Sequence, residues 1–248
     1  MNALAADGLL HDRPALFRAV QDFGRAAGTD HTAVAASLFA QAWAVTVTRP
    51  AIASLVADRR LPDVSAGNTA LLFDADHRPA GSTSLTPRFA AGTGDTAAAA
   101  DPRAEFVAGD DALLAWARAR MFDGHLVGLV DALHEFAPVG RRLLWGNVAA
   151  AAAGGFAALT AQPGHGLDLD QLRADAARLL DHPGSPTEGL AELFPVARNG
   201  IGRLFVRRQT CCLRYRLPDA PPTCLSCRLL PEPERLRRIR LRIEAAVG

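Results

Sequence analysis

The sequence has 248 residues, of which 49% are hydrophobic, so it is long enough and apolar enough to bury one sizeable core. Its formal net charge is +1, which argues against binding of nucleic acid or an anionic membrane through a global positive field. All 27 basic residues are arginine, and the lack of lysine excludes mechanisms that use a Schiff-base lysine or a P-loop lysine.

The N-terminal segment has neither a positively charged start nor an apolar run long enough for a signal peptide. We therefore expect a cytoplasmic protein, in which reducing conditions keep cysteine thiols free. Only the stretch 143–161 could be mistaken for a membrane span. Its alanines contribute little transfer energy and it contains Asn147, so we expect a tightly packed internal helix and no integral membrane segment.

The first part of the chain predicts helices. Residues 1–28 repeat apolar side chains at helical spacing, so they should form an amphipathic opening helix. Asp30 is the expected N-cap of a largely apolar central helix over 31–49. Pro50 should either kink this helix or begin the next one.

The middle of the chain mixes strand and helix patterns. Residues 68–86 predict a strand, a turn and a second strand, and a lone hairpin of this kind must pack on the helices. The low-complexity stretch 90–101 predicts a loop, and Asp101 is the expected cap of one or two helices that follow it. Two more helices are predicted over 141–161 and 164–184.

The C-terminal part carries the strongest signal, because all four cysteines lie within seventeen consecutive residues: Cys211, Cys212, Cys224 and Cys227. A vicinal pair is followed by eleven residues and then by a C-x2-C pair. Such clustering favours a shared ligand over four separately buried thiols. A short extended segment at 205–206 should deliver the first pair, the prolines of 218–222 should form a turn, and a closing helix should follow residue 231.

Three ligands compete for these cysteines on spacing alone. Zinc usually takes a C-x2-C pair at both ends and is bound tetrahedrally, which a vicinal pair fits awkwardly. A [2Fe–2S] cluster spreads four thiolates over two irons and tolerates an uneven arrangement better. Disulfides need an oxidising compartment, which the N-terminal segment argues against. The spacing by itself favours zinc and the cluster about equally.

The cysteine pattern resembles that of the FhuF-type ferric-siderophore reductases, whose C-terminal signature is C-C-x10-C-x2-C around a [2Fe–2S] cluster. The gap in this chain is eleven residues, and the proline-rich turn is expected to absorb the additional one. Three upstream segments are also similar to members of that family, so the resemblance spans most of the chain: VAASLFAQAWAVTV (34–47), RLPDVS (60–65) and RRLLWGNVAAAAAG (141–154).

We therefore expect a mainly α fold, in which a helical body carries one small antiparallel β-hairpin and a C-terminal cysteine-ligated cluster loop. The body, which resembles a siderophore-binding unit, should cover residues 1–200. The cluster segment with its closing helix should cover 201–248, and the two parts should form one compact unit.

The resemblance implies a ferric-siderophore reductase. The four cysteines would hold the iron of a [2Fe–2S] cluster, which passes one electron to siderophore-bound Fe(III) and so releases Fe(II) in the cytoplasm. The implied partners are a ferric siderophore and a ferredoxin- or flavoprotein-like electron donor, without nucleic acid. No catalytic residue beyond the cluster is required. Nearby arginines would tune the cluster or bind an anionic chelate, and the candidates are Arg207, Arg208, Arg214 and Arg216.

Two alternatives use the same cysteines. A structural zinc would make the protein a non-catalytic interaction module, in which loss of the metal unfolds the C-terminal segment. A labile iron–sulfur cluster without a siderophore substrate would make it a redox or iron sensor. The three hypotheses differ in the bound metal and in turnover of a ferric chelate.

Overall fold

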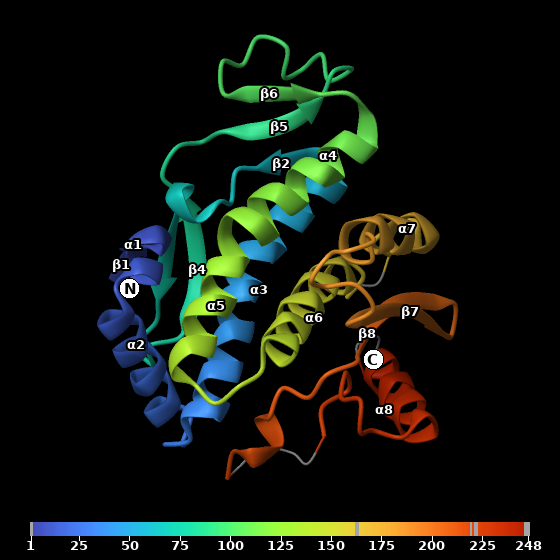
Figure 1. Cartoon of the computed structure of the whole chain (residues 1–248). Helices are drawn as coiled ribbons and strands as arrows, with labels where there is room; N and C mark the ends of the chain where they lie inside the picture. The colour runs from blue at the N-terminus through green and yellow to red at the C-terminus, as the bar shows by residue number, and fades with distance from the viewer. Residues whose placement is uncertain (1, 162–163, 219, 221–222, 246–248) are drawn as a thin grey trace.

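The computed structural model describes residues 2–161, 164–218, 220 and 223–245. Two long helices form its centre, α3 (Thr32–Asp58) and α6 (Arg141–Leu159), and they pack against each other along much of their length (Figure 1). Both are apolar around most of their circumference, which is typical of buried helices. A Cβ at Gly155 of α6 would lie 2.9 Å from the Ile52 side chain of α3, so the glycine allows this close approach.

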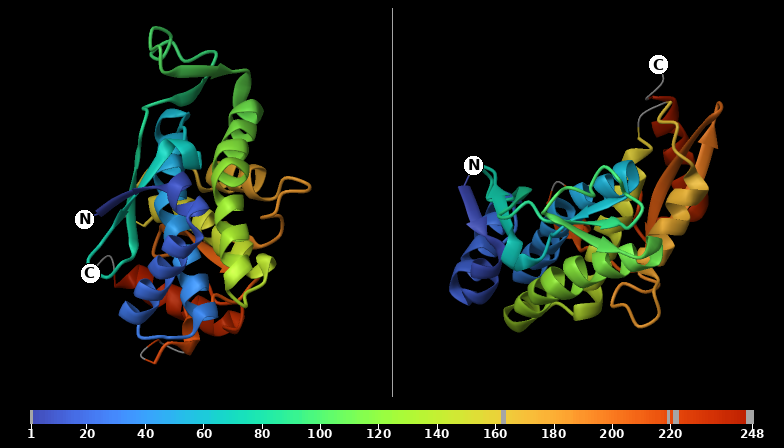
Figure 2. Two further views of the ribbon diagram at one scale, coloured as in Figure 1. Left: turned by 60° about the vertical axis from the view of Figure 1, so that its left-hand side comes forward. Right: turned by 90° about the horizontal axis from the view of Figure 1, so that it is seen from above.

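Further helices surround this pair, and the expectation of a mainly α fold is confirmed. The described helices besides α3 and α6 are α1 (Ala6–His11), α2 (Arg13–Ala26), α4 (Gly109–Arg118), η2 (Ala119–Leu126), α5 (Val127–Phe136), α7 (Leu169–Leu180) and α8 (Glu232–Glu244), with short 3-10 turns at η1 (Ala66–Asn68) and η3 (Arg214–Arg216). The π-helical η2 joins α4 to α5. Figure 2 shows the N-terminal elements (blue) and a pair of strands near the C-terminus (orange) on opposite sides of the central helices.

The hairpin predicted over 68–86 is confirmed as β3 (Thr69–Phe73) and β4 (Pro79–Ser84), which pair in antiparallel register. The structure contains more strands than the one hairpin we expected. β1 (Asn2–Ala5) adds to β3, and a second sheet joins β2 (Arg60–Pro62), β5 (Phe89–Gly92) and β6 (Ala104–Val107). A third sheet is the antiparallel pair β7 (Ala191–Arg198) and β8 (Ile201–Arg208).

Helix α3 continues through Pro50, so the proline does not begin a new helix there. A proline inside a helix removes the hydrogen bond to the carbonyl four residues earlier, which is that of Thr46. The hydroxyl of Ser82 in β4 donates to this carbonyl at 2.7 Å. A strand far along the chain thus satisfies the group that the proline leaves free, and the helix remains continuous.

Two predicted caps are wrong. The N-cap of α3 is His31, whose side chain makes no capping hydrogen bond, and not Asp30. The backbone N–H of His31 instead donates to the hydroxyl of Thr29, so a local turn ends the preceding loop. Asp101 does not begin a helix. Its carboxylate binds the Arg103 guanidinium at 2.6 Å, and β6 follows. The stretch 90–101, predicted as a loop, includes most of β5.

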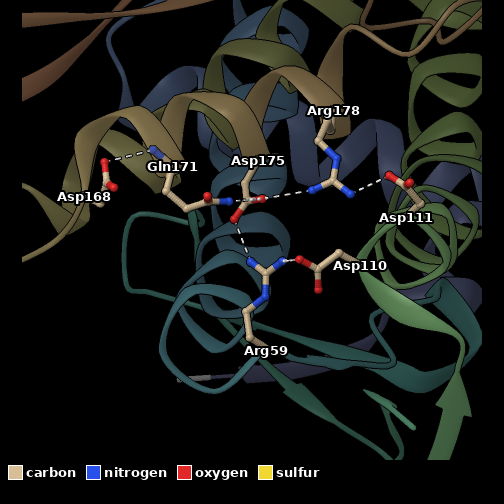
Figure 3. Close-up of polar contacts among 7 residues, drawn as sticks. All are labelled: Arg59, Asp110, Asp111, Asp168, Gln171, Asp175 and Arg178. Carbon is tan, nitrogen blue, oxygen red and sulfur yellow. Dashed lines mark hydrogen bonds and ion pairs between the residues drawn. The ribbon is translucent and has the colours of Figure 1, made fainter. Parts of the chain in front are cut away.

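An ionic network joins the end of α3 to α4 and α7 (Figure 3). Asp175 of α7 is 1% exposed, and its carboxylate lies 2.6 Å from Arg59 and 3.5 Å from Arg178. These two arginines also pair with Asp110 and Asp111 at the start of α4. Each charge in the network therefore lies beside an opposite charge.

The expected boundary after residue 200 falls in the turn between β7 and β8, so the two strands of one hairpin stand on either side of it. β8 packs on α6, while α8 packs on β7. Across the described ranges, no helix is both long enough and apolar enough to cross a membrane.

Candidate cysteine site

Strand β8 delivers the vicinal cysteines, as the sequence predicted for residues 205–206. The strand ends at Arg208, and Thr210 then enters a notch in helix α6 at Gly146. A Cβ on residue 146 would lie 1.8 Å from the Thr210 hydroxyl oxygen, so only glycine fits there. The small residue in the Trp-Gly-Asn segment of α6 thus seats the residue immediately before Cys211.

Arg208 enters the helical body beside this notch. Its side chain is 1% exposed and lies between α3 and α6. The guanidinium donates to the side-chain oxygen of Asn147, to the carbonyl of Gly146 at 3.4 Å and to the side-chain oxygen of Gln41 at 3.4 Å. The Arg208 Nε is also buried and has no hydrogen-bond partner in the described structure.

A chain of hydrogen bonds continues from Asn147 to the cysteines. The Asn147 amide donates to the carbonyl and the hydroxyl of Ser37, at 2.7 Å and 2.9 Å. The Ser37 hydroxyl in turn donates to the carbonyl of Cys212 at 2.9 Å. Because all of these groups are buried, the network fixes the vicinal pair against both central helices.

The side chains of Cys212 and Cys224 lie close enough to interact, which brings one member of each cysteine pair together. Their interaction raises the pKa of the Cys212 thiol, as does burial, and lowers the pKa of Cys224 to about 5. The Ser226 hydroxyl, 3.5 Å from the Cys224 sulfur, and the charge of Arg208 also favour the Cys224 thiolate. Of the two, Cys224 therefore loses its proton more readily.

Cys211 and Cys227 are half-buried in the same two loops. The backbone N–H of Cys227 donates to the Cys224 carbonyl at 3.0 Å, so the C-x2-C pair forms a tight turn. Considering only the residues that the structure describes, no three His, Cys, Asp or Glu side chains lie close enough to hold a metal ion. The structure thus brings two of the four predicted ligands into contact. Most of the predicted proline turn, at 219 and 221–222, lies outside the described residues.

The donor set suits a thiolate-ligated metal or cluster. Thiolates are the ligands of iron–sulfur clusters and of many zinc sites, and a C-x2-C turn is common to both. The Arg208 Nε is buried without a partner, and the charge of this residue acts on Cys212 and Cys224, which favours a negatively charged group near them. The chemistry of the four cysteine side chains therefore suits such a group, and the structure brings Cys212 and Cys224 together.

Residues 37–198 match the family described as Ferric iron reductase FhuF-like transporter. The chain belongs to this family. The match begins at Ser37 and includes Gly146 and Asn147, so it covers the surface on which the cysteine segment docks. It ends before the cysteines, so their resemblance to the C-C-x10-C-x2-C pattern, with a gap of eleven residues in this chain, is a separate observation. No curated protein matches the chain.

In this FhuF-like chain the closing helix α8 supports the second cysteine pair. Arg235 is 3% exposed, and its guanidinium donates to the carbonyls of Cys227 at 2.7 Å and Leu230 at 2.9 Å. Arg238 donates to the Thr223 carbonyl at 3.3 Å. The sequence analysis missed both roles. The available signal was the spacing of Arg235, four residues before the buried Ile239 on the same helical stripe.

The four candidate arginines of the FhuF-like chain lie in different environments. Arg207 pairs with Glu192 and Glu232 and lies over the Phe194 ring. Arg214 and Arg216 are exposed, and the Arg216 guanidinium lies 5.9 Å from the centre of the Tyr215 ring. Arg208 alone among the four is joined to the cysteines by the buried network.

Proposed function

We propose that this protein is a ferric-siderophore reductase whose four cysteines hold a [2Fe–2S] cluster. Membership of the ferric iron reductase family supports reduction of Fe(III). The observation that carries the proposal is the approach of Cys212 to Cys224, on a segment that the Ser37 hydroxyl holds to the family-matched helices. This contact joins the two cysteine pairs that the cluster would need.

The residues of the chain hold, orient and shield the site. Cys211, Cys212, Cys224 and Cys227 would supply the four thiolates, and Ser37 and Arg235 fix the backbone carbonyls of one cysteine in each pair. A [2Fe–2S] cluster bound there supplies single electrons at a potential that its surroundings set. Siderophore oxygen ligands hold Fe(III) more tightly than Fe(II), so one-electron reduction releases the substrate iron.

The proposed reaction takes one electron from an external ferredoxin- or flavoprotein-like donor in the cytoplasm. No proton transfer is required to change Fe(III) to Fe(II), which is why no acid or base residue is assigned. The protein contributes proximity and the electrostatic surroundings of the cysteines.

The decisive experiment is anaerobic purification followed by visible absorption spectroscopy and quantification of iron, sulfide and zinc. We expect about two irons and two sulfides per chain, and a red-brown colour that bleaches with dithionite. The reduced protein should then convert a ferric siderophore to Fe(II), measured with a ferrous-specific chelator. Cys224→Ser should lose both colour and turnover.

Two outcomes would replace the proposal. A colourless protein with one zinc per chain would indicate a structural module, which the tight C-x2-C turn would equally suit. An intact cluster that reduces no ferric chelate, with hydroxamate and catecholate siderophores both tested, would indicate a redox or iron sensor.

A further inference from the structure

Arg208 carries a positive charge that no described carboxylate neutralises. Its side chain is 1% exposed, and its described hydrogen-bond acceptors are the neutral oxygens of Asn147, Gly146 and Gln41. Burying a charge without an opposite charge costs several kcal/mol, so such residues are rare unless an anion is bound beside them. The adjacent Arg207 shows the ordinary solution, because it pairs with two glutamates.

The position of Arg208 relates it to both cysteine pairs. Its backbone N–H donates at 3.1 Å to the carbonyl of Ser226, which lies inside the C-x2-C turn. Its guanidinium reaches the carbonyl of Cys212 through Asn147 and Ser37. One residue is thus linked to the turn of the second pair by its backbone N–H and to the first pair by the buried network of its side chain.

We propose that Arg208 is the positioning residue of the cysteine site and supplies the buried counter-charge for its thiolates. This inference rests on the proposed function only in that the cysteines bind a thiolate-ligated group. Four thiolates with one Zn²⁺, or with an oxidised [2Fe–2S] core, both carry net negative charge, so Arg208 stabilises either. Arg207, Arg214 and Arg216 do not share this role.

Zinc binding to the anaerobic, metal-free protein tests the proposal without any activity assay. In a titration against a competing chelator, Arg208→Gln should bind zinc about 10- to 100-fold more weakly than the natural protein. Arg208→Lys keeps the charge and should recover part of the loss. The matched control is Arg207→Gln, which should change zinc affinity by less than about threefold because glutamates already neutralise that side chain.

A second variant gives Arg208 an internal counter-charge. The side-chain oxygen of Gln41 lies 3.4 Å from the guanidinium, so Gln41→Glu places a carboxylate there without removing Arg208. We expect this variant to raise the melting temperature of the metal-free protein and to lower its zinc affinity. A purely structural arginine predicts unchanged zinc affinity for Gln41→Glu.

Natural zinc affinity in both Arg208→Gln and Gln41→Glu would overturn the inference. If Arg208→Gln does not fold, Arg208→Lys and Gln41→Glu decide the question. Failure of the proposed function is separate: a protein purified with zinc and no iron contradicts the reductase, while the order of zinc affinities still tests Arg208.

Discussion

Asp175 and Arg208 are both 1% exposed, yet their charges are neutralised in different ways. The Asp175 carboxylate lies between Arg59 and Arg178, which reach further carboxylates, so each charge of the network lies beside an opposite charge (Figure 3). Arg208 contacts only neutral oxygens among its described partners. The network at α7 is complete by itself, whereas the one at the cysteines becomes complete only with an anion. The buried charges of the helical body are therefore paired within the chain, whereas the cysteine segment carries a buried charge that a bound anion would pair.

Asp175→Ala would break the first half of this comparison and should have the largest effect. It leaves Arg59 and Arg178 without their buried partner, so the free energy of unfolding should fall by about 3–5 kcal/mol. Chemical denaturation measures the loss. The control Asp170→Ala removes an exposed carboxylate from the same helix and should leave stability almost unchanged. Equal effects of the two variants would show that the buried network does not stabilise the body.

His125 sharpens the comparison, because it is a buried titratable residue that stays neutral. Its Nδ1–H donates to the Val64 carbonyl at 2.6 Å, and its Nε2 accepts from Trp43 at 2.9 Å. Burial lowers the pKa of His125 from 6.5 to about 4. As the pH falls below 6.5, the imidazole of the unfolded chain is therefore protonated before that of the folded chain. The stabilisation is full above pH 6.5 and should be lost by pH 4, a change of about 3 kcal/mol.

Denaturation at several pH values measures how steeply the free energy of unfolding falls with pH. His125→Gln should flatten it between pH 6.5 and pH 4, whereas replacement of the exposed His11 by glutamine should not. An unchanged slope in His125→Gln would assign the acid sensitivity to other groups.

Gly146→Ala tests the contact between helix α6 and the cysteine segment, and of the changes proposed it should have the smallest effect on stability. The new methyl group would overlap Thr210, which must then move, at a cost of about 1–3 kcal/mol. Displacement of the cysteine segment should also lower the iron content per chain, measured by metal analysis. Gly154→Ala, on the same helix with no heavy atom within 4 Å of the added Cβ, should keep both stability and iron content. Loss of iron in both variants would contradict the docking role of the notch.

Local patterns predicted most of the helices, because their periodicity follows burial, but the opening helix expected over 1–28 is the strand β1 followed by the two helices α1 and α2. The stripe of α2 and the apolar surface of α6 were predicted correctly. The sequence left two alternatives at Pro50, a kink in the helix or the start of a new one, because the hydroxyl of Ser82 that compensates for the proline comes from a distant strand. The strand β5 was not predicted, since its alanines and glycine have little strand preference, and β6 was not predicted because the helix was expected to begin at Asp101.

At the candidate site, the clustering of the cysteines indicated the proposed ligand residues, but the sequence did not distinguish Arg207 from Arg208. These neighbours point to opposite faces of β8, and the packing of that strand on α6 decides which of them is buried. The one local signal was the two-residue alternation that puts Arg208 on the same face as the buried Leu204. The roles of Ser37 and Gln41 depend on tertiary contacts and left no pattern.

The notch at Gly146 also indicates an order in which the parts of the protein come together. Residues 2–180 contain both central helices and the whole ionic network, so none of these contacts involves Thr210. Docking of the cysteine segment then follows, and it buries a charge that calls for an anion. Under the proposed function, the metal or cluster would bind after this docking, because only the docked segment brings Cys212 and Cys224 together.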